Sequence, residues 1–224
     1  MEIFIVTAAR NEEKQIAYVL KGLRRKGYNN IVVVDDGSAD DTAAIARKGN
    51  AHVLQHVINR GQGAALRTGI DYALLHHADI IVTFDADGQH DPNEIKDMIE
   101  PIINGECQVT LGSRFLGKSP NIPWIKKIML KGGILFTYLV SGIKLTDAHN
   151  GFRALSRSAA QMIEIRQDRM EHASEIVEEI HKKQISYKEV PVTIRYTRYS
   201  IQHGQSPFAS FKIAFNLLVR KLVR

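Results

Sequence analysis

The chain has 224 residues, of which 44% are hydrophobic and 24% charged, and its formal net charge is +6 at pH 7. These values exclude an intrinsically disordered chain and indicate one large globular domain whose basic excess suits anionic partners such as nucleotides, nucleic acid or an acidic membrane surface. The single cysteine, Cys107, excludes a disulfide framework or a thiolate zinc site within the chain and favours a reducing compartment.

The first half of the chain alternates short apolar runs with amphipathic segments. Strands are predicted at 3–8, 31–34, 52–55, 80–84 and from 109 to 111. Helices are predicted at 11–26, 40–48, 61–77 and 93–103, the last with Asp91 as its cap and Pro92 as its first residue. This alternation predicts an α/β fold with a Rossmann-like, mostly parallel central sheet flanked by helices.

The second half is less regular. It predicts an apolar helix at 128–140, a charged helix at 172–183 and a strand through 190–194. An amphipathic helix follows Pro207, with Phe208 and Phe211 among its apolar residues and basic residues elsewhere. The chain is therefore divided into a domain at 1–206 and a basic C-terminal helix at 207–224. That helix can lie on an anionic membrane, or pack on its own domain or in a dimer.

The chain start and its apolar runs bear on location. The first thirteen residues lack the basic n-region of a signal peptide, and no apolar stretch reaches the roughly 20 residues that span a bilayer. The expected location is cytoplasmic, with peripheral contact to the inner membrane face left open. Trp124, beside two lysines, is expected to pack on the domain rather than lie at a membrane interface.

Acidic residues follow three of the predicted strands. Asp35 and Asp36 follow the second strand, Asp85 and Asp87 follow the fourth, and Glu12 follows the first. In open α/β sheets ligands bind outside the carboxyl ends of the strands, so one crevice collects these carboxylates. Gathering like charges is costly unless a cation compensates, and oxygen ligands favour a hard divalent metal. Each motif alone is more often a solvated turn; their combination favours a site.

The loop at 59–69 contains two glycines but fits neither common nucleotide motif. Leu66 stands where a dinucleotide fingerprint has its third glycine, and no Gly-Lys-Ser/Thr is present. The loop can simply begin a helix. Its backbone N–H groups and Arg60 or Arg67 can also approach an anionic group.

Seven segments together match a family: ARNEE (9–13), VVVDDGSADDT (32–42), NRGQGAALRTGI (59–70), FDADGQHDP (84–92), GSRF (112–115), DAHNGFRAL (147–155) and EVPVTIRY (189–196). With them the chain resembles the inverting glycosyltransferases of family 2, which have the GT-A fold. Within that family it is most similar to the polyprenyl-phosphate sugar synthases of the dolichyl-phosphate mannose synthase group.

The resemblance implies roles for individual residues. Asp36 is expected to accept a hydrogen bond from the nucleotide base. Mn²⁺ or Mg²⁺ is expected at Asp85, Asp87 and Gln89, and Arg114 and Arg153 are candidates for phosphate or acceptor contacts. Asp147 lies where the family presents an acidic residue toward the acceptor; a helix cap or a partner for Arg153 is the other interpretation. The full nucleotide-sugar set is Ala8, Arg10, Glu12, Asp36, Gly63, Arg67, Asp85, Ala86 and Asp87; the catalytic set is Asp87, Asp147, Arg114 and Arg153.

Two positions depart from the family pattern. Arg10 stands where a tyrosine usually packs near the base, which leaves the base open. Gln62 replaces a common lysine and removes one positive charge near the diphosphate. His90 is either a metal ligand or, as favoured here, a hydrogen-bonding residue of the loop.

The resemblance implies a metal-dependent transfer of a hexose from a GDP- or UDP-linked sugar to a polyprenyl phosphate. A phosphate acceptor is already an anionic nucleophile and needs no strong base. The alternative is transfer to a sugar hydroxyl in polysaccharide or glycoconjugate assembly, with Asp147 as base. A nucleotidyltransferase or a non-catalytic nucleotide-binding protein ranks lower. No nucleic-acid partner is expected, and an oligomer is left open.

Overall fold

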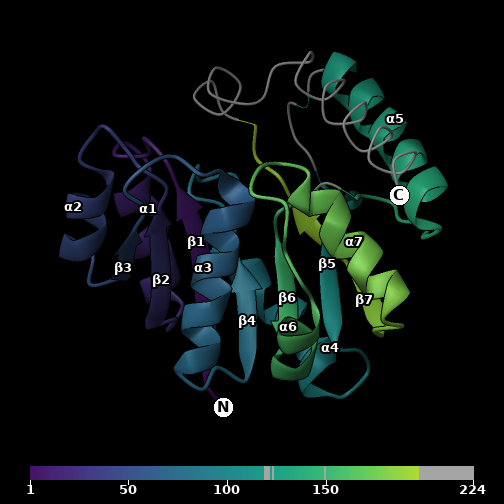
Figure 1. Cartoon of the computed structure of the whole chain (residues 1–224), viewed down its shortest axis with the longest axis horizontal. Helices are drawn as coiled ribbons and strands as arrows, with labels where there is room; N and C mark the ends of the chain where they lie inside the picture. The colour runs from purple at the N-terminus through teal and green to yellow at the C-terminus, as the bar shows by residue number, and fades with distance from the viewer. Residues whose placement is uncertain (119–121, 123, 149, 197–224) are drawn as a thin grey trace.

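The computed structural model describes residues 1–118, 122, 124–148 and 150–196 (Figure 1). A seven-stranded sheet has the order β3-β2-β1-β4-β6-β5-β7. Its strands are β1 (Ile3–Ala9), β2 (Asn30–Asp35), β3 (His52–Gln55), β4 (Ile80–Thr83), β5 (Val109–Lys118), β6 (Arg153–Ser156) and β7 (Tyr187–Thr193). The predicted helix at 207–224, and with it the division after residue 206, lies outside the described residues.

The sheet is mostly parallel, as the sequence predicts. Only β6 is reversed among the described strand pairs, since it runs antiparallel to both β4 and β5. Strand β6 and the short helix after it, α6 (Arg157–Met162), were not predicted from the sequence. A four-residue strand that begins with a buried arginine does not read as an apolar run.

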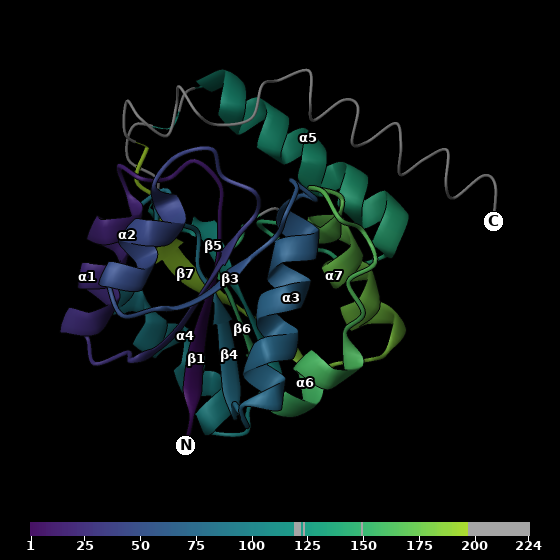
Figure 2. The same cartoon turned by 60° about the vertical axis from the view of Figure 1, so that its left-hand side comes forward.

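Helices cover both faces of the sheet (Figure 2). They are α1 (Ile16–Arg25), α2 (Thr42–Lys48), α3 (Gln62–Leu75), α4 (Ile95–Ile103), α5 (Trp124–Ser141), α6 and α7 (His172–Lys182), with a 3₁₀ turn at Pro92–Glu94. Alternate residues of the strands serve the two faces. Val32 and Val34 pack with α3 and α7 in one core cluster, whereas Ile31 and Val33 pack with α1 and α4 in the other.

The start of α1 differs from the prediction. The helix begins at Ile16, five residues later than expected, because the chain from Asn11 makes a turn first. Asn11 has φ 54°, and the N–H groups of Glu12 and Glu13 donate to Thr42 Oγ1 and Asp40 Oδ2 instead of entering a helix. The Asp91 cap is confirmed: its side chain accepts the N–H of Asn93 at 3.0 Å, ahead of the turn at Pro92.

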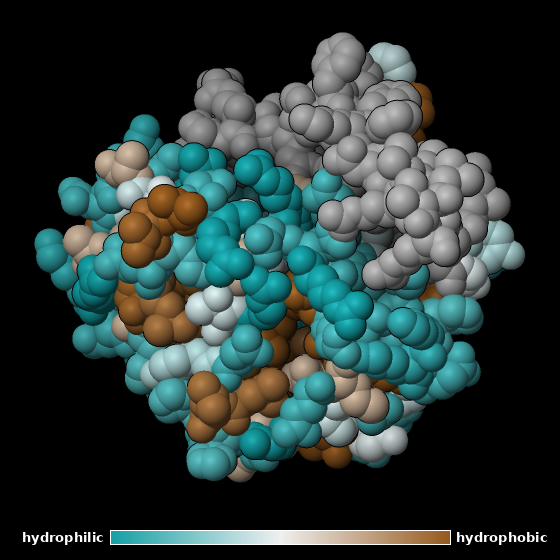
Figure 3. Space-filling model, viewed as in Figure 1, coloured by the Kyte–Doolittle hydropathy of each residue, from teal (hydrophilic) through white to brown (hydrophobic). Residues whose placement is uncertain are grey.

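Helix α5 lies beyond the carboxyl ends of the strands and packs against α7 (Figures 1 and 2). Trp124 at its start is 72% exposed, so the expectation that this side chain packs on the domain was wrong. Apolar side chains also reach the surface elsewhere, where Figure 3 shows them as separate brown patches among hydrophilic residues. In the described part of the chain, no helix combines the length and apolarity needed to cross a membrane.

Candidate active site

The acidic loop after β4 places Asp85 between two hydrogen-bond donors. Gln62 Nε2, on the first residue of α3, donates to Oδ1 at 3.2 Å, and His90 Nε2 lies 2.9 Å from Oδ2. Burial raises the pKa of Asp85, but the contact with His90 and the charge of Arg153 more than offset this, so the pKa is lowered. Asp85 therefore carries its negative charge at the end of the sheet.

The next residues of the loop have separate environments. Asp87 is half-buried, and its Oδ1 accepts the N–H of Gln89 at 3.0 Å. The carbonyl of Gln89 accepts the N–H of Arg195 from the segment after β7. Ala86 is buried and packs into the core cluster that contains α1 and α4, so its side chain is structural. The loop is thus held by the Asp87 side chain, by the Gln89 carbonyl and by the packing of Ala86 in the core.

His90 is the buried member of the loop. The residue is 5% exposed, and its ring packs against Phe84 and Phe152, with ring centroids 5.3 and 5.0 Å away. Among the described residues, Nδ1 has no hydrogen-bond partner. The contact with Asp85 fits the hydrogen-bonding interpretation of His90.

Asp36, expected at the nucleotide base, is fully engaged by the chain itself. Its Oδ1 lies 2.7 Å from His56 Nδ1 and accepts the N–H of Arg60; its Oδ2 accepts from the Asn59 amide and the N–H of Gly61. A carboxylate has about four acceptor sites, so these four contacts use them all in this structure. Burial raises the pKa of Asp36, but these donors outweigh it and the pKa is lowered.

The loop at 59–69 packs tightly against the segment before α7. A Cβ on Gly63 would lie 2.0 Å from the carbonyl oxygen of Gln167, so glycine is required there for close approach of two backbones. Arg67 donates to the carbonyl of Ile165 and to Asp168 at 2.9 and 3.2 Å. Contacts within the protein therefore already account for Gly63 and Arg67, and their predicted role toward the nucleotide sugar would be an additional one.

The end of β1 contributes three of the predicted nucleotide-sugar residues. Ala8 is half-buried, Arg10 is exposed and Glu12 is half-buried. β1 lies between β2 and β4 in the sheet, so this segment leaves the sheet between the Asp36 and Asp85 loops. The structure thus places the three strand ends side by side, as the sequence predicts.

Asp147 lies in a buried ion pair with Arg114. Its Oδ2 accepts Arg114 Nε at 2.6 Å and the Arg114 backbone N–H at 3.1 Å, and 1% of the Asp147 side chain is exposed. Arg114 Nη1 also donates to the hydroxyl of Tyr196 at 2.7 Å. Burial lowers the pKa of Arg114, but Asp147 and Tyr196 outweigh it and keep it charged. The described ion-pair partner of Asp147 is Arg114, whereas Arg153, the partner considered from the sequence, interacts with Asp147 only electrostatically.

Arg153 is a buried cation that interacts electrostatically with two carboxylates. Its Nη2 donates to the carbonyl of Ala173 at 3.2 Å, and burial lowers its pKa to about 10 against the opposing effects of Asp85 and Asp147. Next to it, burial and the Arg153 charge lower the pKa of His172 to about 4. His172 Nδ1 lies 2.7 Å from the carbonyl of Arg169 and donates to it, since a carbonyl can only accept.

The comparison with known proteins identifies the group to which this site belongs. The model described as "Glycosyl transferase family 2" matches residues 4–163. The chain belongs to glycosyltransferase family 2. It is 36% identical over 243 residues to a UDP-N-acetylglucosamine–dolichyl-phosphate N-acetylglucosaminyltransferase of Methanococcus voltae, covering 98% of this chain and 96% of the relative. The family and the neighbourhood of lipid-phosphate sugar transferases predicted from the motifs are confirmed.

Two further proteins resemble this glycosyltransferase, one in sequence and one in structure. It is 29% identical over 233 residues to the dolichol-phosphate mannosyltransferase of Pyrococcus furiosus, covering 97% of this chain and 64% of that protein. Glucosyl-3-phosphoglycerate synthase of Mycobacterium tuberculosis, solved with Mn²⁺, UDP and glucosyl-3-phosphoglycerate, superposes with a TM-score of 0.75 at 17% identity, over 99% of this chain and 79% of that one. The latter likeness confirms the GT-A-like fold.

The loop after β4 in this glycosyltransferase fits a hard divalent cation. Within the described ranges, no group of three or more His, Cys, Asp and Glu side chains is arranged to hold a metal. A magnesium-type site needs fewer, because such ions use one or two carboxylates and take their other oxygens from a substrate diphosphate and water. Each Asp85 oxygen accepts one hydrogen bond and keeps a lone pair that a cation can use, whereas Asp87 and the Gln89 amide as further ligands stay a prediction.

Three residues at the site make contacts that the sequence motifs did not predict. Gln62 was noted only as a missing lysine, yet it bonds Asp85. Tyr196 holds Arg114, and the charge of Asp87 contributes to raising the Tyr196 pKa, after burial as the main cause. His56 holds Asp36. A polar residue that follows or begins a predicted element was the available signal for each of the three.

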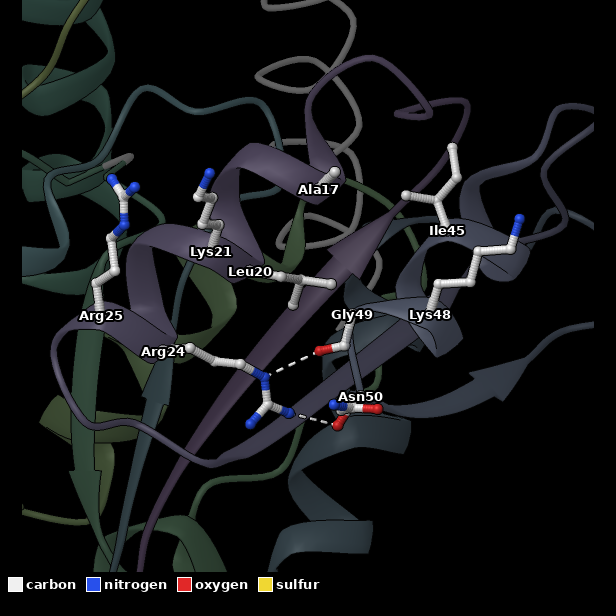
Figure 4. Close-up of a pocket in the computed structure, with 9 residues that line it drawn as sticks. All are labelled: Ala17, Leu20, Lys21, Arg24, Arg25, Ile45, Lys48, Gly49 and Asn50. Atoms are coloured by element: carbon white, nitrogen blue, oxygen red, sulfur yellow. Dashed lines mark hydrogen bonds between the residues drawn. The ribbon is translucent and has the colours of Figure 1, made fainter.

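A separate groove lies between α1 and α2 on the outside of the fold (Figure 4). It is lined by Leu20, Lys21, Arg25, Ile45 and Lys48, among others. Arg24 ties the two helices together there, since its Nε donates to the carbonyl of Gly49 at 2.9 Å (Figure 4). Basic residues in the last turn of both helices complement the helix dipoles. These structural roles explain the basic residues of the groove, and none of the carboxylates described above lines it.

Proposed function

We propose that this family 2 glycosyltransferase moves a sugar from a nucleoside diphosphate to a polyprenyl phosphate, with a divalent cation at Asp85 and Asp87. The observation that carries the choice of acceptor is the burial of Asp147 against Arg114. A hydroxyl acceptor needs a base that can reach its proton, and Asp147 was the expected base. A phosphate acceptor is already ionised, so the ion pair is no obstacle to it.

The charges near Asp85 support the proposed binding of a nucleotide-sugar donor. Departure of a nucleoside diphosphate builds negative charge on the leaving oxygens, which a divalent cation offsets as a Lewis acid when it is bound. Asp85, Asp87 and Gln89 would hold that cation. Arg153 lies close enough to Asp85 to affect its pKa, so it is a cation available near the diphosphate. The chain itself thereby supplies orientation and compensating charge.

The acceptor end has support from α5. Trp124 is 72% and Ile128 61% exposed, and Lys127 and Lys131 are exposed on the same helix. Exposed aromatic and aliphatic side chains with adjacent lysines favour contact with an anionic membrane surface. This would bring a lipid-linked phosphate toward the carboxyl ends of the strands, beyond which α5 lies. The relative from Methanococcus voltae is named for transfer to dolichyl phosphate.

A donor and acceptor panel tests the proposal. The protein is incubated with UDP- and GDP-linked sugars, Mn²⁺ or Mg²⁺, and either a short polyprenyl phosphate or a glycan acceptor. Mass spectrometry should show a sugar on the lipid phosphate, with UDP sugars tried first because of the relative's donor. Asp87→Asn should abolish the product. A product on the glycan alone would overturn the lipid-phosphate acceptor, and full activity of Asp87→Asn would overturn the metal assignment.

A further inference from the structure

Two side chains from different elements hold one carboxylate of the proposed cation site. Gln62 begins α3, His90 belongs to the loop after β4, and their Nε2 atoms lie 3.2 and 2.9 Å from the two oxygens of Asp85. A carboxylate can only accept, so both nitrogens donate. One hydrogen bond on each oxygen restricts rotation of the carboxylate about its terminal bond.

Burial of His90 costs free energy, and its contact with Asp85 is maintained despite that cost. A buried ring nitrogen without a partner loses its hydration, and Nδ1 of His90 is such an atom in the described structure. The aromatic rings of Phe84 and Phe152 hold the imidazole in place. An apolar side chain would suit this core position at least as well. The bond from Nε2 to Asp85 is what an apolar residue cannot supply.

Gln62 is connected to the nucleotide end of the site through its own backbone. Gly61 and Arg60, just before it, donate their N–H groups to Asp36 at 2.7 and 2.9 Å. The turn fixed by Asp36 therefore leads directly to the side chain that holds Asp85. Gln62 is uncharged, so it orients Asp85 without neutralising it, whereas a lysine at this position would compete with a cation.

We propose that Gln62 and His90 are positioning residues that hold the Asp85 carboxylate ready for the cation of the nucleotide-sugar complex. This inference rests on the proposed function, because that function requires a cation at Asp85. Partners that orient a metal ligand typically change metal affinity about 10- to 100-fold when they are removed. Loss of either donor should therefore weaken cation binding without unfolding the protein.

The test measures Mn²⁺ binding directly by electron paramagnetic resonance, in one series with UDP and in a parallel series with GDP. His90→Leu removes the donor and keeps an apolar side chain between the two phenylalanines. His90→Gln returns an N–H near the position of Nε2. Gln62→Met removes the amide at similar length, and Gln161→Met, on an exposed position of α6, is the matched control. Thermal unfolding without metal checks that each variant is folded.

We expect His90→Leu and Gln62→Met to raise the Mn²⁺ dissociation constant about tenfold or more. His90→Gln should recover most of the affinity, and Gln161→Met should match the wild type. Unchanged Mn²⁺ affinity in both folded donor-removal variants would overturn the inference, as would a wild type that binds no Mn²⁺ with either nucleotide. Mn²⁺ binding that depends on the two donors, without sugar transfer to any acceptor, would support the inference and overturn only the proposed function.

Discussion

Arg114 and Asp147, 33 positions apart, form an ion pair with 2.6 Å between Nε and Oδ2 and almost no exposure of either side chain. The pair joins β5, which contains Arg114, to the segment before β6, and Tyr196 from the segment after β7 adds a contact through its hydroxyl. A carboxylate in this setting stabilises a buried guanidinium. It is poorly placed to take a proton from an acceptor in solvent.

Asp147→Asn should therefore destabilise the fold by about 3 kcal/mol, because it removes the charge that compensates a buried arginine. Urea unfolding at pH 7 measures the change. Glu164→Gln is the control, since the ion pairs of Glu164 with Arg166 and Lys183 lie at the surface and their loss should change the unfolding midpoint little. If Asp147→Asn abolished turnover at unaltered stability, Asp147 would be a base and the hydroxyl acceptor would be favoured.

The sequence motifs correctly predicted where the strands end. They did not predict most of the hydrogen bonds and ion pairs that join side chains at these ends. Continuous apolar runs such as 31–34 and 80–84 identify buried parallel strands, and carboxyl ends of parallel strands must meet. The contact of Asp85 with His90 is local, but Gln62 and Arg114, which bind Asp85 and Asp147, lie 23 and 33 positions away, where only tertiary packing decides the partner. The late start of α1 has the same cause, because Thr42 and Asp40 bind the N–H groups of its expected first turn.

Asp36 should make stability depend on pH in the acid range. Its pKa in the folded protein lies below the ordinary value of 3.8. A lowered carboxyl pKa adds stability that is present above the unfolded pKa, near pH 4, and is lost as the pH falls through the folded pKa. Asp36→Asn should remove this part of the acid dependence and loosen the turn at 59–61. Unfolding free energies measured from pH 6 down to about pH 2.5 test this.

For Asp36 the matched control is Asp41→Asn, at the exposed start of α2. It should retain the slope of the wild type in the acid range. If the unfolding free energy of Asp36→Asn changed with pH as it does in the wild type, the four donors around Asp36 would not lower its pKa.

His172 should produce a separate pH dependence at higher pH. Its folded pKa is lowered to about 4 from 6.5, mainly by burial and then by Arg153. For a base with a lowered pKa, the unfolded chain takes up the proton first, so stability is complete above about pH 6.5 and falls as the pH drops toward about 4. His172→Gln should flatten the unfolding free energy in that window. His76→Gln, at an exposed histidine, should leave the slope unchanged, and a flat wild-type curve would contradict the prediction.

Gly151→Ala should disturb the active site more than the fold. A Cβ at position 151 would lie 2.7 Å from both carboxylate oxygens of Asp85, closer than such atoms can approach, so the carboxylate must move. Because small displacements of a positioned group can cost about 100-fold in rate, we expect a fall in kcat/KM of about 10- to 100-fold and weaker Mn²⁺ binding. The control is Gly132→Ala on α5, where a Cβ meets nothing within 4 Å. That change should leave turnover intact and, in a helix, stabilise by up to about 1 kcal/mol. Wild-type turnover in Gly151→Ala would show that the position of Asp85 does not limit the reaction.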